Sequence, residues 1–263
     1  MKGIKDAQRI VVKVGTSTLT YDTGKVNLRR MDKLAQVISD LRNSGIEVAL
    51  VTSAAIAVGV GKLGLPARPK DIPSRQAVAT VGQCELMYTY DKLFGEYNHT
   101  VAQILLTKED IEHERRCENF RNTIFRLLEL GALPVINEND TVATDEIVIG
   151  DNDTLAAIVA ANLEADLLIL LSDIDGLYTC DPHKHPDASL LPVVRELTPD
   201  IIALGEGKGS ALGTGGMKTK LHAAEIAMNA GIDMVIANGA QPSVLYRIAD
   251  GEAVGTRFLG KRG

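Results

Sequence analysis

The sequence predicts an α/β fold in which a mainly parallel sheet is covered by helices, and two observations support this prediction. A β-branched run at 9–14 is followed by apolar residues at helical spacing from Leu28 to Leu41, and then by a second apolar run at 46–51. This order is a βαβ unit, whose strands run parallel and are covered by the helix between them. The 263 residues are 45% hydrophobic, which is enough to bury a large core. This length allows one large α/β domain or two small ones.

The remaining elements follow from the same patterns. Asn27 is a candidate N-cap for the first helix, and Gly45 is expected to end it. Ser53 is placed to cap the next helix, and Ser74 is the expected cap of the helix after it. The segment 59–64 matches G-x-G-x-x-G, but it lies well beyond the preceding strand rather than in the strand–helix turn, so we interpret it as a helix end and not as a dinucleotide site. Further strands are expected at 99–106, 133–136, 166–171 and 233–237, and further helices at 74–94, about 120–130, 153–162, 217–230 and 243–249.

The charge balance argues against a nucleic-acid-binding protein. Lys and Arg number 28 against 34 Asp and Glu, which gives a net charge of −6 without a basic block. Small molecules are the expected partners. We find neither the apolar core of a signal peptide nor an apolar run long enough to span a membrane, so we expect a cytoplasmic protein.

The cysteines and clustered histidines do not predict a metal site or a disulfide framework. Cys84, Cys117 and Cys180 are odd in number and widely spaced, without a C-x-x-C pair. His183 and His185 lie in a loop rich in Pro and Asp, where two histidines without further ligands usually face solvent.

The segment 213–220, G-T-G-G-M-K-T-K, is a candidate phosphate site. A glycine-rich loop that runs into a helix offers backbone N–H donors and a positive helix end. Lys218 and Lys220 would lie in the first turn of that helix. The segment is not a P-loop, because Met217 occupies the last glycine position of that motif. An ordinary glycine loop with two solvated lysines is the alternative.

Other polar residues follow predicted strands, at the sheet edge where open α/β folds bind ligands. Lys13 lies inside the first strand, where a charge indicates an edge or a site; a solvated strand end is the alternative. Clusters of Asn and acidic residues at 137–140 and 150–153 hold more polar groups than turns need, and together they predict a polar pocket. Simple turns or a calcium site are the alternatives, although EF-hand spacing is absent. The proline-marked loop 66–73 could flank the pocket.

Taken together, these motifs resemble the amino-acid kinase family along nearly the whole chain. They are V-V-K-V-G-T-S at 11–17, V-T-S-A-A-I at 51–56, I-N-E-N-D at 136–140, G-D-N-D at 150–153, L-S-D at 171–173 and G-T-G-G-M-K-T-K at 213–220. I-N-E-N-D followed by G-D-N-D is the more specific signal, for a glutamate acceptor. The resemblance implies a single domain over 1–263, a three-layer αβα sandwich with an amino-acid-binding half at about 1–165 and an ATP-binding half at about 166–263.

The sequence departs from this family in two places. Ala54 stands where the family usually has glycine, so its methyl group is expected to crowd a close backbone approach. Many relatives also carry a C-terminal PUA domain, whereas this sequence ends at Gly263.

The resemblance implies ATP-dependent phosphorylation of the glutamate side-chain carboxylate, the first step of proline biosynthesis. A carboxylate is already nucleophilic, so the site must supply alignment and positive charge rather than a general base. The implied catalytic residues are Lys13, Lys220 and Asp153, with Asp153 between the lysines. The implied glutamate-binding residues are Ser53, Asn137, Asp140, Asp151 and Asn152. The implied ATP-binding residues are Lys13, Gly15, Thr16, Ser172, Asp173, Thr214, Gly215, Gly216, Met217, Lys218, Thr219 and Lys220.

Further partners follow from the same resemblance. Mg²⁺ would accompany the ATP phosphates with few protein ligands. Proline shares the amino-acid head group of glutamate and is expected to act as a feedback inhibitor, and a homo-oligomer is expected. The alternatives are a kinase acting on N-acetylglutamate or carbamate, or a non-catalytic amino-acid or nucleotide sensor on the same fold.

Overall fold

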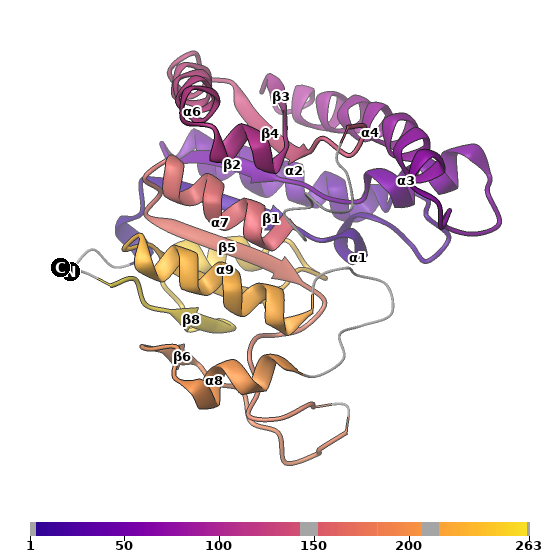
Figure 1. The fold of residues 1–263 in the computed structure, drawn as a ribbon. Helices are drawn as coiled ribbons and strands as arrows, with labels where there is room; N and C mark the ends of the chain where they lie inside the picture. The colour runs from indigo at the N-terminus through magenta and orange to yellow at the C-terminus, as the bar shows by residue number, and fades with distance from the viewer. Residues whose placement is uncertain (1–3, 143–151, 183, 207–215, 262–263) are drawn as a thin grey trace.

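The computed structural model describes residues 4–142, 152–182, 184–206 and 216–261, which form a three-layer αβα sandwich around an eight-stranded sheet (Figure 1). Its strand order is β3-β4-β2-β1-β5-β7-β8-β6, and only the β7–β8 pair is antiparallel among the paired strands described. The strands are β1 (Arg9–Val14), β2 (Glu47–Val51), β3 (Val101–Leu106), β4 (Leu133–Glu138), β5 (Leu167–Ser172), β6 (Val193–Val194), β7 (Asp233–Asn238) and β8 (Thr256–Phe258). The predicted mainly parallel sheet is confirmed.

Helices cover both faces of this sheet. One layer contains α2 (Leu28–Asn43), α3 (Ala55–Leu63), α4 (Ile72–Gly95) and α10 (Val244–Ala249), and the other contains α6 (Glu114–Glu129), α7 (Asn152–Asn162) and α9 (Met217–Asn229). Shorter helices are α1 (Thr16–Leu19), α5 (Lys108–Glu112) and α8 (Pro199–Ala203). None of the helices in the described part of the chain is both long and apolar enough to cross a membrane.

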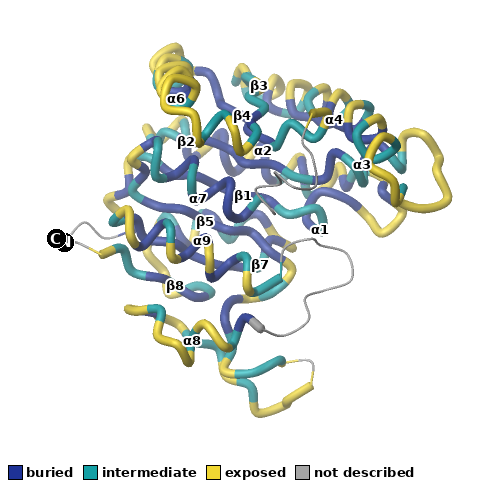
Figure 2. Tube along the Cα trace, viewed as in Figure 1, coloured by how far each residue is buried: buried dark blue, intermediate teal, exposed yellow. Residues whose placement is uncertain are grey.

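The sheet separates two hydrophobic cores, as the alternation of β5 shows. Leu167, Ile169 and Leu171 pack into the core beneath α2 and α4, whereas Leu168 and Leu170 pack into the core beneath α7 and α9. A central strand of a parallel sheet is buried on both faces, which explains why this run is continuously apolar. Figure 2 shows the same burial along the middle strands.

The segment 59–64 forms the end of α3, as expected, and its glycines serve helix packing. A Cβ atom placed on Gly59 would lie 2.0 Å from the Val78 carbonyl oxygen of α4, and one on Gly82 would lie 1.7 Å from the Ala55 carbonyl oxygen. Only glycine permits so close a crossing of two backbones. Gly64 then ends α3 with φ 64°. The segment therefore does not form a dinucleotide-binding turn.

Two predicted helix caps are wrong. Asp71, not Ser74, is the N-cap of α4, and its side chain accepts the Ser74 backbone N–H. At α3 the N-cap position is Ala54 rather than Ser53. The short strands β6 and β8 were not predicted, because two or three residues are too few to carry a periodic signal.

Candidate active site

The predicted site residues that the structure describes gather at one edge of the sheet. β1, β2, β4, β5 and β7 run parallel, so their carboxyl ends lie at this edge. Helices α7 and α9 both begin at this edge, and they pack side by side on one face of the sheet. Residues from five strands and two helices can therefore meet one ligand.

Lys13, Asp153 and Lys220 form a buried ion cluster at this edge. Lys13 Nζ lies 2.6 Å from Asp153 Oδ1, and Lys220 Nζ lies 3.0 Å from Asp153 Oδ2. Strand alternation places Lys13 on the same face of β1 as Val11, which packs into the core beneath α7 and α9. The first turns of those two helices supply Asp153 and Lys220, so the predicted arrangement of an anion between two lysines is present.

The electrostatics of this cluster favour a permanently ionised Asp153. Asp153 is fully buried, and Lys13 and Lys220 are 8% and 5% exposed. Burial alone would raise the pKa of Asp153, but the two neighbouring ammonium groups outweigh it and hold that pKa well below the usual range. Two ammonium groups against one carboxylate leave a net positive charge, which suits an anionic ligand.

The start of α9 offers donors to phosphate. Gly216 is its N-cap and has no side chain to accept them, and the first backbone N–H groups of a helix have no intrahelical acceptors. The Thr219 hydroxyl lies 3.0 Å from Asp153 Oδ2 and 2.8 Å from the Gly216 carbonyl oxygen, and its single proton can be donated to either. Thr214 and Gly215 lie outside the described residues.

A chain of amide hydrogen bonds joins three of the predicted glutamate-binding residues. Asn152 Nδ2 lies 2.6 Å from the Thr52 carbonyl oxygen, 3.0 Å from Ser53 Oγ and 2.9 Å from Asn137 Oδ1. Asn137 in turn donates to Gln83 Oε1 at 2.9 Å. The chain thus fixes Ser53 after β2, Asn137 on β4 and Asn152 at the start of α7. Asp151 lies outside the described residues.

Gln83 is a site residue that the sequence did not reveal. It lies on α4, far in sequence from both asparagines, and it is buried. Its Nε2 has no hydrogen-bond partner among the described residues. An isolated glutamine in a helix gives no sequence signal, so only the packing of α4 against the sheet could show that it orients Asn137.

Two arginines bring positive charge to Asp140. Burial raises the pKa of Asp140, and Arg68 and Arg75 act against this rise. Among the described residues none forms an ion pair with Asp140 within 4.0 Å. Arg68 belongs to the proline-marked loop that was expected to flank a pocket, and this proximity supports that expectation. Neither arginine was predicted as a site residue.

The residues predicted for the nucleotide lie at the ends of β1 and β5. Ser172 is buried and donates to Asp173 Oδ1 at 3.1 Å, whereas Asp173 is exposed. Thr16 begins α1. Gly15 was expected to donate its backbone N–H to phosphate, but that group donates to the Leu171 carbonyl oxygen at 3.3 Å. In the structure described, the pairing of β1 with β5 uses the Gly15 donor, and its contact with phosphate stays a prediction.

Glycine suits the position of Ala54 for a reason that the sequence did not show. Its backbone has φ 80° and ψ 6°, the left-handed region that favours glycine. This strain is a second reason why glycine suits the position, and the expected crowding of a close approach stays a prediction. A side chain here costs backbone strain next to Ser53.

Comparison with known proteins gives consistent results. A model described as the amino acid kinase family matches residues 8–238. The chain is 54% identical to the glutamate 5-kinase of Clostridium perfringens, over 100% of this chain and 99% of that protein, and 52% identical to that of Listeria innocua, over 99% and 96%. A glutamate 5-kinase of Caldanaerobacter subterraneus is 55% identical over 95% of this chain but only 68% of its own length.

Solved structures show the same fold at low sequence identity. A UMP kinase from Bacillus anthracis superposes with a TM-score of 0.67 at 18% identity, covering 97% of both chains. An isopentenyl phosphate kinase from T. acidophilum gives 0.64 at 18% identity, covering 95% of this chain and 99% of the other. At such identity the likeness concerns the fold alone.

Proposed function

This chain belongs to the amino acid kinase family, and we propose that it uses the buried Lys13–Asp153–Lys220 cluster to transfer the γ-phosphoryl group of ATP to L-glutamate. The activity is ATP-dependent phosphorylation of the glutamate side-chain carboxylate, which yields L-glutamyl 5-phosphate and ADP in proline biosynthesis. Identity above 50% along the whole chain to proteins named glutamate 5-kinase carries this conclusion.

In the proposed mechanism the two lysines stabilise the transferring phosphoryl group from opposite sides. The acceptor carboxylate attacks phosphorus in line with the departing ADP oxygen, and negative charge spreads over the phosphoryl oxygens. Lys13 faces the acceptor and Lys220 faces the nucleotide, while Asp153 fixes both ammonium groups through contacts of 2.6 and 3.0 Å. Asp153 acts as a positioning anion and not as a base, since its lowered pKa leaves it a weak proton acceptor.

Mg²⁺ would enter with ATP as part of the co-substrate. The described carboxylate nearest the reacting groups, Asp153, is already paired with two lysines, which supports a metal held mainly by phosphate oxygens. When bound, the ion neutralises phosphate charge. The protein contributes the first-turn N–H groups of α9, with Thr16, Ser172 and Asp173 along the nucleotide.

The amide chain and Asp140 are proposed to bind the amino-acid head of glutamate. Ser53, Asn137 and Asn152 are held in place by the hydrogen bonds among them, so they can accept a ligand with little reorganisation. Asp140 lies beside positive charge but in no described ion pair, and the substrate α-ammonium would supply one. Proline carries the same head group, so it is proposed to compete for Asp140.

A substrate panel tests the assignment. ADP release should be stimulated by L-glutamate far more than by N-acetylglutamate, aspartate or carbamate, because a blocked amine would leave Asp140 without its cation. ADP release without Mg²⁺ should be negligible. A preference for N-acetylglutamate would contradict the glutamate assignment, and nucleotide binding without turnover on any acceptor would indicate a sensor. Assembly into a homo-oligomer stays a prediction.

A further inference from the structure

A second cluster of reactive side chains lies in the excursion 178–190, which follows β5 on the nucleotide side of the chain. Its two limbs pair at their base through the bridge between Tyr178 and Leu190. The Thr179 backbone N–H donates to the Ser189 carbonyl oxygen at 3.0 Å, and the Ser189 N–H donates to Thr179 Oγ1 at 3.1 Å. The excursion is therefore a closed loop with a defined base.

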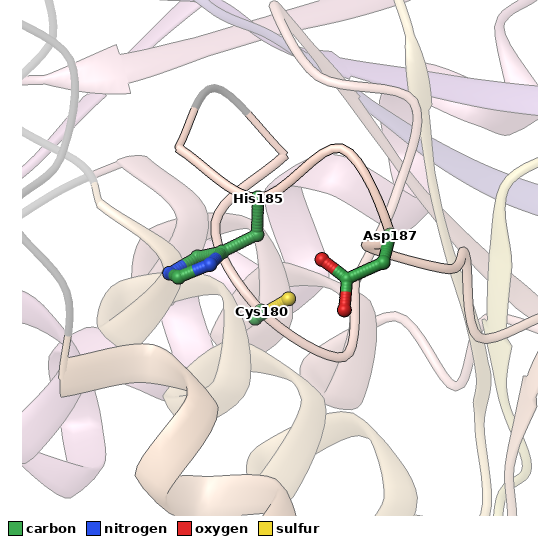
Figure 3. A group of neighbouring side chains, drawn as sticks. All are labelled: Cys180, His185 and Asp187. Atoms are coloured by element: carbon green, nitrogen blue, oxygen red, sulfur yellow. The ribbon is translucent and has the colours of Figure 1, made fainter.

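Three side chains of the types that bind metal ions lie close together in this excursion. The ligand atoms of Cys180, His185 and Asp187 all lie within 4.8 Å of one another, and Figure 3 shows the three side chains next to each other. Cys180 is partly buried, whereas His185 and Asp187 are exposed. From the sequence Cys180 was expected to be an ordinary thiol and His185 to face solvent alone. The reversal of the chain between the two limbs is what brings them together.

We propose that Cys180, His185 and Asp187 bind a divalent transition-metal ion, with Zn²⁺ as the best fit. A thiolate, an imidazole and a carboxylate form a ligand set that favours zinc over the hard cations Mg²⁺ and Ca²⁺. In a tetrahedral zinc site with bonds of about 2.0–2.3 Å, neighbouring ligand atoms lie roughly 3.3–3.8 Å apart. The limbs need to close by about 1.5 Å at most, and water can take the fourth position.

Local interactions support this site. The Asp181 carbonyl oxygen accepts the backbone N–H groups of Lys184 and His185, at 3.1 and 3.0 Å, which fixes the turn that presents His185. The Lys184 ammonium is paired with Asp181 Oδ2 at 2.8 Å. This pairing offsets its positive charge, which would otherwise repel a bound cation. On binding, Cys180 Sγ releases its proton to solvent and His185 coordinates as the neutral imidazole.

Cobalt titration of the full chain, after removal of bound metal with EDTA, tests the proposal. With excess Mg²⁺ present, one equivalent of Co²⁺ should produce a near-ultraviolet thiolate-to-cobalt charge-transfer band, and Zn²⁺ should abolish it. Cys180→Ser should remove the band and weaken metal affinity at least about a hundredfold, and Asp187→Asn should weaken it about tenfold or more. Cys84→Ser and His222→Gln, which alter an exposed thiol and an exposed imidazole elsewhere, should leave it unchanged.

Alkylation of the unmutated chain gives a second measurement that does not depend on the variants folding. Zn²⁺ should slow iodoacetamide modification of Cys180 at least about tenfold without slowing that of Cys84, as mapped by mass spectrometry. Equal rates at Cys180 with and without Zn²⁺ would overturn the proposal. A missing charge-transfer band, or its displacement by Mg²⁺, would also overturn it.

Discussion

Asp153 and Asp140 belong to the two sides of the proposed site, and their surroundings shift their pKa values in opposite directions. Asp153 is fully buried between two ammonium groups that lower its pKa. Asp140 is partly buried, and its desolvation raises its pKa because Arg68 and Arg75 compensate only in part. On the proposed phosphoryl-transfer side, lysines of the protein neutralise the charge of Asp153. On the proposed amino-acid side, the charge of Asp140 is compensated only in part.

This difference explains how the two sides would work. A carboxylate whose charge is satisfied before any ligand binds can hold two lysines rigidly through the reaction, as electrostatic preorganisation requires. A carboxylate without a described ion-pair partner is stabilised most by a cation that arrives with the substrate. The comparison predicts that variants on the first side affect catalysis and that variants on the second side affect recognition.

The largest effect is expected for Lys13→Met and Lys220→Met. Each removes charge stabilisation of the transition state and should lower kcat about 100–1,000-fold, with a much smaller loss of folding stability, because Asp153 keeps one lysine. Steady-state ADP release and urea unfolding measure the two quantities. Lys62→Met is the control, since Lys62 forms an exposed pair with Glu85. A kcat within threefold of wild type would disprove the assigned role.

Asp140→Ala tests the recognition side. Losing one charge-assisted hydrogen bond, worth about 1.5–3 kcal/mol, should raise the KM for glutamate roughly tenfold to hundredfold and weaken proline inhibition alongside it. The KM for ATP should change less. Proline titrations at several glutamate concentrations decide this, with Asp91→Asn on the exposed face of α4 as the control. Unchanged proline inhibition in the variant would refute a shared site.

The pH dependence of stability should separate the two carboxylates. The lowered pKa of Asp153 contributes stability above its usual value of 3.8, and this is lost as pH falls through the folded-state pKa. Asp153→Asn should therefore cost about 3–5 kcal/mol at neutral pH and less in acid. The raised pKa of Asp140 has the opposite sign, so Asp140→Asn should stabilise the fold at neutral pH and lose this effect below 3.8. Urea unfolding across this pH range measures the effect of each variant on the free energy of unfolding. If the comparison is wrong, the effects of the two variants will change with pH in the same direction.

The smallest effect is expected at Ala54, next to the amino-acid side. Ala54→Gly relieves a left-handed backbone strain of about 1–2 kcal/mol, and the added freedom of the unfolded chain takes back about 0.5–1 kcal/mol. The free energy of unfolding should rise by up to about 1.5 kcal/mol. Ala57→Gly, inside α3, should lower it by about 1 kcal/mol. A loss of stability in both variants would contradict the strain argument.

The sequence by itself determined most helices and strands, and it showed the charged and polar residues that interrupt or follow them. The apolar runs of β1, β2 and β5 gave a parallel sheet, and Lys13 stood out because a charge inside such a run is costly unless it is paired. The glycines before α9 and the lysines in its first turn, with the polar groups at the end of β4, predicted a phosphate site and an amino-acid site on one edge. These signals are local, so they can be read without contacts.

Only the tertiary structure decided which distant residues touch. Gln83 reaches Asn137, and Arg68 and Arg75 approach Asp140, because α4 and the loop before it pack over the end of β4. Cys180 meets Asp187 because the excursion folds back on itself. Periodicity specifies which face of an element a side chain occupies, but not which element lies opposite it. That choice depends on packing across the whole sheet, and the strain at Ala54 depends likewise on the path the chain must take into α3.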